Sequence, residues 1–234
     1  MKTWMKQTDD EDDEITDDKQ WTAGDFAIVS SDNVRFHIDR HYLMSASSVF
    51  RDMLSVGGPG GDAGQVHLTD RSIETAVVIG SFLRLVTTAE LGFFPWETVK
   101  LVNLARFLLK FDCSAAVKVL VLLAQEKITA RKTSKIYLWV LGAAIDDPDL
   151  CVNAMTNDSL TATWTGENEF DTDATRCQVK GNVFNPQALS FTWWSIIPGE
   201  YLWALNRAWA MAGNTKELPV KFKELLTAAK ACDT

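Results

Sequence analysis

The feature that most constrains this sequence is a change of periodicity between residues 25 and 54. Residues 26–29 and 34–38 follow the two-residue period of a half-buried strand. Between them, Ser31-Asp32-Asn33 supplies residue types that favour tight turns. From residue 43 onward the apolar side chains follow the helical period, in two short runs separated by Ser47, which is a favoured N-cap residue. The sequence therefore predicts a β-hairpin that leads into two short helices.

Several unrelated residue types in this region keep a fixed spacing, namely Asp25, Asp32, Phe36, Arg40, Leu43, Ser47, Phe50, Met53 and Leu54. In these residues the chain resembles the start of a BTB/POZ domain, of the type abundant in fungi. That family has a histidine where Asp39 stands here, and an aspartate at this position is able to cap the following helix. Shorter matches at residues 68–70, 82–85 and 105–113 extend the resemblance over residues 24–130.

The resemblance implies an α+β fold for residues 24–130, with a small sheet of about three strands packed with α-helices. Residues 131–234 carry mostly helical patterns, and we expect a helical C-terminal extension with a long polar loop near residues 156–185. Residues 1–23 contain eight acidic side chains against three lysines, which is −5 of the total formal charge of −8. We expect this segment to be an acidic disordered tail.

Composition excludes several classes of function. The chain is acidic and has no basic stripe, so we expect no direct binding to nucleic acid. No apolar run approaches the roughly 20 residues that a membrane helix needs, so we expect no membrane partner. Acidic residues stand where a secretory signal would be apolar. An intracellular location, in the cytoplasm, the nucleus or both, is therefore expected.

The chemistry-bearing residues form no recognisable catalytic or metal motif. His37, His41 and His67 lack the His-Glu-x-x-His spacing of a zinc protease, and no nucleotide-binding or nucleophile-elbow motif occurs. The four cysteines are widely spaced and form no Cys-x-x-Cys pair, so neither a zinc site nor a disulfide framework is indicated. We therefore expect no cofactor, no metal and no enzymatic activity, and we interpret the chain as a protein-interaction module.

The resemblance implies self-association, as a homodimer or with another BTB protein, through the first strand and first helix. The candidate interface residues are Asp25, Phe26, Ile28, Arg40, Tyr42, Leu43 and Met44. Phe26, Ile28 and Leu43 have an alternative role in the core of the monomer, which must bury such side chains in any case. Tyr42 and Met44 belong to types enriched at contact surfaces. Asp25 and Arg40 match a charged pair at the family's dimer interface, or form an ordinary surface ion pair.

A second activity that the resemblance implies is adaptor work on a cullin scaffold of a ubiquitin ligase. The candidate cullin-facing residues are Phe50, Arg51 and Met53. Relatives with this activity carry a hydrophobic-x-Glu motif after the second helix, whereas this chain has a glycine-rich stretch at residues 55–62. That difference weakens the adaptor hypothesis.

The C-terminal third is rich in tryptophan. Five of the chain's nine tryptophans, Trp139, Trp193, Trp194, Trp203 and Trp209, fall between residues 139 and 209. Large aromatic groups dominate both cores and interfaces. They predict a packed helical core, and a recognition groove is the alternative that surface exposure would reveal.

Overall fold

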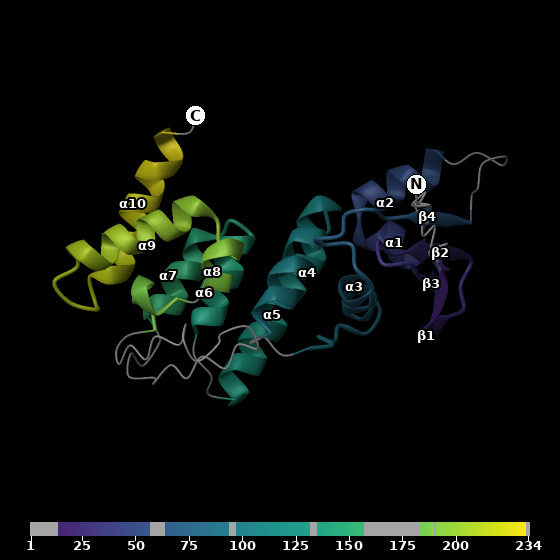
Figure 1. Cartoon of the computed structure of the whole chain (residues 1–234), viewed down its shortest axis with the longest axis horizontal. Coiled ribbons are helices and arrows are strands. Elements are labelled where there is room, and N and C mark those ends of the chain that lie inside the picture. Colours follow the sequence, from purple (N-terminus) through teal and green to yellow (C-terminus); the bar gives the residue numbers. More distant parts are fainter. Residues whose placement is uncertain are drawn as a thin grey trace, which may run out of the picture.

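The structure of the chain is a computed structural model that describes residues 14–56, 64–93, 97–131, 135–156, 183–189 and 191–232. Its elements, in chain order, are β1 (Thr16–Thr22), β2 (Phe26–Val29), β3 (Val34–Ile38), α1 (Arg40–Ala46), α2 (Ser48–Val56), β4 (Gln65–His67), α3 (Ala76–Thr88), α4 (Thr98–Lys110), α5 (Ser114–Arg131), α6 (Ile136–Ala144), α7 (Pro148–Thr156), the 3₁₀ turn η1 (Pro186–Ala188), α8 (Phe191–Ile196), α9 (Gly199–Met211) and α10 (Leu218–Cys232). Figure 1 shows the sheet with α1 and α2 at one end, α3 to α5 in the middle, and α6 to α10 at the other end.

The expected α+β class is confirmed, but among the described residues the sheet has four strands instead of about three. Their order is β1-β3-β2-β4, and β2 and β3 form the predicted antiparallel hairpin. Strand β4 pairs parallel to β2, and β1 pairs parallel to β3. The prediction of disorder up to residue 23 is therefore wrong for Thr16–Thr22, while residues 1–13 lie outside the described part of the chain.

The two short helices follow the hairpin as predicted. The hydroxyl oxygen of Ser47 accepts a hydrogen bond from the backbone N–H of Phe50 at 3.0 Å, which confirms its role as the cap of α2. The same hydroxyl donates to the carbonyl of Phe111 and so ties α2 to the end of α4. Asp39 stands at the N-cap position of α1, yet its side chain makes no capping hydrogen bond.

Helix α3 begins later than the sequence suggests. Thr69 and Asp70 are residue types that favour a helix start, but the first residue of α3 is Ala76. The N–H of Ala76 donates to the carboxylate of Asp32 in the hairpin turn at 2.7 Å, so the cap comes from a distant part of the chain. Helices α3, α4 and α5 then pack on one another beside α1.

The predicted C-terminal helices are present, with α6 in their centre. Every side chain of α6 from Leu138 to Ala143 is buried, so this helix is enclosed on all sides. It packs against α4 and α5 on one side and against α7 on the other, and the buried apolar residues of the whole chain form one continuous cluster. Gly142 permits the close approach of α7, because an added Cβ would lie 2.8 Å from Cys151 Sγ.

Most of the long loop expected near residues 156–185 lies outside the described residues, which resume at residue 183. Among the helices that the structure describes, none combines the length and apolar character needed to cross a membrane.

Candidate interaction surface

The first candidate feature is the charged pair at the start of α1. Gly24 precedes it with φ of 148°, and an added Cβ there would lie only 2.2 Å from the carbonyl carbon of Ile38. This close approach brings Asp25 beside the helix: its Oδ1 accepts the backbone N–H of Arg40 at 2.7 Å, and its Oδ2 accepts Arg40 Nε at 2.6 Å. The hydrogen bond from the Arg40 backbone, together with the guanidinium, lowers the pKa of Asp25.

This pair is therefore more than the surface ion pair considered as an alternative. Asp25 satisfies one of the free N–H groups at the start of α1, a role that Asp39 leaves unfilled. Both side chains stay open to solvent, 53% for Asp25 and 41% for Arg40, so the pair is also accessible to a partner.

The exposed side of α1 carries the second feature. Tyr42 and Met44 are half-buried, and the ring of Tyr42 lies 4.1 Å from that of His41 between centroids. Phe26, Ile28 and Leu43 are instead at most 5% exposed in the monomer core. The assignment of these three residues to a dimer interface is wrong, because a partner cannot reach them without local unfolding. They hold the sheet and α1 together underneath the surface.

On α2 the structure separates the candidate cullin-facing residues. Phe50 is fully buried, and its ring stacks on that of Phe111 with centroids 4.7 Å apart, so its assignment to a contact surface is wrong. Arg51 is exposed, and its Nε donates to the carbonyl of Met44 at 3.1 Å, which links α2 to α1. Met53 is 38% exposed, and Val49, one helical turn before it, is 39% exposed. Sequence reasoning missed Val49, although its spacing of four residues from Met53 could have indicated a shared face.

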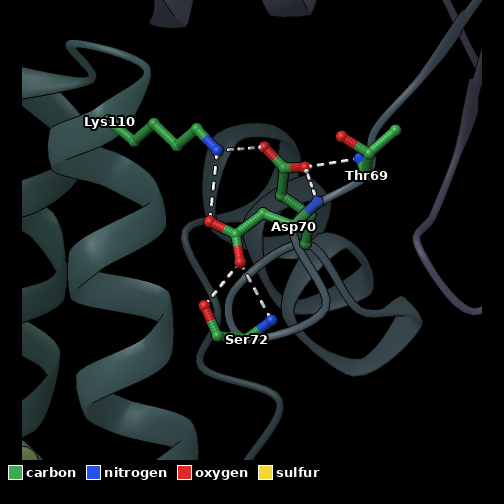
Figure 2. A network of polar contacts seen from close by, with 5 residues as sticks. Thr69, Asp70, Ser72 and Lys110 are labelled. Carbon is green, nitrogen blue, oxygen red and sulfur yellow. Dashed lines mark hydrogen bonds and ion pairs between the residues drawn. The ribbon is translucent and has the colours of Figure 1, made fainter.

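A polar network that sequence reasoning also missed fixes the loop before α3 (Figure 2). Glu74 is buried, and its Oε2 accepts the N–H groups of Thr69 and Asp70 at 2.7 and 2.6 Å. Lys110, at the end of α4, lies 2.8 Å from the other oxygen of Glu74 and 3.3 Å from Asp70. Hydrogen bonds from Ser72, followed by Lys110, lower the pKa of Asp70 to about 2. The network joins the loop between β4 and α3 to the end of α4, so we assign it a structural role.

The tryptophans of the C-terminal part divide into two groups. Trp139 and Trp193 are at most 1% exposed and belong to the core, as expected. Trp194 and Trp203 are 42% and 44% exposed, on α8 and α9, where Phe191 is also exposed. Arg207 lies 6.0 Å above the ring of Trp203. The fifth, Trp209, is partly buried and packs against the core. The core interpretation therefore holds for Trp139 and Trp193, whereas Trp194 and Trp203 stand at the surface.

Within the described residues, no group of three or more histidine, cysteine, aspartate or glutamate side chains could hold a metal ion. Cys113 and Cys151 are buried free thiols, and Cys232 is exposed. Burial raises the pKa of Cys113 to about 12.

Comparisons with protein-family models, with curated proteins and with solved structures give no match to this chain.

Proposed function

We propose that this chain is a non-catalytic protein-interaction module of the BTB/POZ type, which self-associates or scaffolds partners through the surface of α1. The α1 surface consists of Asp25, Arg40, Tyr42 and Met44. One observation carries the proposal: a half-exposed aromatic and a half-exposed thioether stand beside an open charged pair, on a helix that is anchored from below by Leu43. We expect it to act inside the cell.

Three features of the fold support the proposal of a BTB/POZ-type module. A hairpin leads into two short helices, Ser47 caps the second of them, and β4 then pairs parallel to the first strand of the hairpin. This is the order of elements on which the sequence resemblance rests. The α1 surface also has the character of a contact patch, because Tyr, Met and Arg are enriched at protein interfaces.

The test is the mass of the full chain in solution, measured by light scattering after size exclusion over concentrations up to tens of micromolar. We expect a dimer that dissociates on dilution. The double substitution Tyr42→Glu and Met44→Glu should yield a monomer, because an unpaired carboxylate buried at an interface costs several kcal/mol. Circular dichroism would verify that the variant remains folded.

The matched control is Leu122→Glu on α5, where the wild-type side chain is 64% exposed and distant in sequence from α1. This variant should associate as the wild type does. A wild-type chain that stays monomeric over the whole concentration range, or a Tyr42/Met44 variant that still forms the dimer, would contradict the proposal.

A second candidate function is that of an adaptor that binds a cullin through α2. The observation that favours it is the exposed apolar pair Val49 and Met53 beside the exposed Arg51. A pull-down of a cullin by the wild-type chain, abolished by Val49→Glu with Met53→Glu and retained by Val77→Glu on α3, would support it. Retention of the cullin by the α2 variant would exclude this surface.

A further inference from the structure

Helix α9 has one buried side and one side that is open to solvent. The helix packs against α10 and η1. Its buried side is formed by Tyr201, Leu202, Ala204, Leu205 and Ala208. On the open side, Trp203 is 44% exposed, Met211 is 58% exposed, Arg207 is exposed, and Glu200 in the first turn is half-buried. We call Glu200, Trp203, Arg207 and Met211 the α9 face.

The four side chains of the α9 face point in similar directions. With 3.6 residues per turn, they fall within an arc of about 80° around the helix axis. Glu200 and Arg207 are about two turns apart and differ by only about 20° in direction. Trp203 lies between them along the helix, and the Arg207 guanidinium stands 6.0 Å from the centre of its ring. An acidic group and a basic group therefore flank an exposed aromatic ring on a single helix face.

The two charges of this face do not neutralise each other within the helix. Side chains three or four residues apart are neighbours on a helix, whereas Glu200 and Arg207 are seven residues apart, about 10.5 Å along the axis. Among the described ion pairs of the C-terminal helices, none involves either residue. Each charge is therefore available to a group of opposite charge on another molecule.

The order of these charges makes the face complementary to itself. When two copies of α9 pack antiparallel about a twofold axis midway between positions 203 and 204, Glu200 of each copy lies opposite Arg207 of the other. The two Trp203 side chains then meet beside the axis, and tryptophan and arginine are the types that dominate binding energy at interfaces. A parallel pair would instead place like charges opposite each other, which is unfavourable. The antiparallel second copy is therefore the partner that the face fits.

We propose that the α9 face is a second self-association surface, whose occupant is the α9 face of another copy in this antiparallel arrangement. It lies at the opposite end of the molecule from α1 (Figure 1). The α9 pair does not depend on the α1 surface, but together the two twofold contacts would link α1 dimers into a longer assembly, a consequence that rests on the proposed function. One helix face is smaller than a standard interface, so we expect a dissociation constant on the order of 0.1–1 mM, above the concentrations at which the α1 dimer is tested.

The test is sedimentation equilibrium of the full chain with Tyr42→Glu and Met44→Glu, so that the α1 surface does not contribute, at concentrations that span the expected dissociation constant. In this background, Glu200→Arg and Arg207→Glu should each weaken the pairing about tenfold, because two attractive contacts become repulsive. An equimolar mixture of the two charge variants should pair as the background protein does, since every arginine again faces a glutamate. A chain that carries both charge reversals should recover the pairing for the same reason.

The matched control is Lys118→Glu on α5, which makes the same charge change as Arg207→Glu at another exposed position and should leave the pairing unchanged. Circular dichroism would verify that each variant is folded. A background chain that stays monomeric throughout, or pairing that neither single reversal weakens, would overturn the proposal. Weakening by both reversals without recovery in their mixture would overturn the antiparallel second copy as the occupant. A dimer of the background chain at tens of micromolar would instead contradict the α1 surface, and only the α9 pair responds to the charges at positions 200 and 207.

Discussion

The contact between α6 and α7 can be tested by adding one methyl group, through Gly142→Ala. The new Cβ would lie 2.8 Å from Cys151 Sγ and 3.1 Å from two backbone atoms, the carbonyl oxygen of Asp147 and the nitrogen of Cys151. Overpacking of this kind costs roughly 1–3 kcal/mol. Since backbone atoms cannot rotate away, we place the cost near the upper end. The gain of about 1 kcal/mol for alanine over glycine in a helix offsets part of it, which leaves a net loss of about 2 kcal/mol.

A chain of this length shifts its melting temperature by about 2–4 °C per kcal/mol, so Gly142→Ala should lower Tm by roughly 4–8 °C in calorimetry. The matched control is Gly80→Ala in α3, where the nearest atom to the new Cβ is Phe36 Cε1 at an ordinary 3.6 Å. This substitution should raise the free energy of unfolding by about 0.5–1 kcal/mol. If both variants are stabilised, α6 and α7 are not in close contact and the reasoning fails.

Three further outcomes follow from the geometry. Ala89 ends α3 in the left-handed region with φ of 53°, so Ala89→Gly should stabilise the chain by about 1 kcal/mol in urea unfolding; a loss would contradict it. The pKa of Asp70 is depressed to about 2, so its contribution to stability is present above pH ~4 and disappears as pH falls through about 2. Ser72→Ala should therefore be less stable than the wild type at neutral pH, with a gap that closes over that range. Native alkylation at pH ~8, mapped by mass spectrometry, should modify exposed Cys232 about a thousandfold faster than buried Cys113. The reason is that the Cys113 pKa of about 12 leaves little of its reactive thiolate at this pH. Equal rates would contradict the burial of Cys113.

The parts of the fold that sequence reasoning predicted are those fixed by local pattern. Within the predicted helical extension, the apolar run that is ended by Asp146-Asp147-Pro148 becomes α6, at Ile136–Ala144. The hairpin and the cap at Ser47 were also predicted, because turn and cap residues act within four positions of themselves.

The errors occur where distant residues decide the local structure. The sequence of β1 has the composition of a solvated acidic segment, and it becomes a strand through pairing with β3. The register shifts between Asp17 and Thr22, where Asp18 Oδ1 accepts the N–H groups of Gln20 and Trp21. Thr69 and Asp70 have the residue types of a helix start, yet their N–H groups donate to the buried carboxylate of Glu74. The side chain that caps α3 is instead that of Asp32, 44 residues from Ala76, and no local sequence pattern predicts this contact.

In the candidate surface, too, local sequence pattern predicted some features, and contacts with distant residues decided the others. The resemblance implied contact roles for Phe26 and Phe50, but apolar character alone does not distinguish a core position from an interface position. The distinction depends on which elements cover each side chain, and for Phe50 this is set by the stacked ring of Phe111. Tyr42 and Met44 were the better interface candidates, and they are the two of the five apolar candidates that keep exposed surface.

The division of the chain at residue 131 is a division of the sequence pattern and not of the core. Helix α6 is buried on all sides, and α4 covers one of them. Arg106 on α4 donates to the carbonyl of Ile196 at 2.7 Å, which ties the two parts together again 90 residues later. Removal of residues 132–234 would therefore expose the buried side of α4 to water and leave Arg106 without this acceptor. Self-association must accordingly be measured on the full chain, because the first 130 residues alone would present an apolar face that is covered in the intact protein and would associate through it.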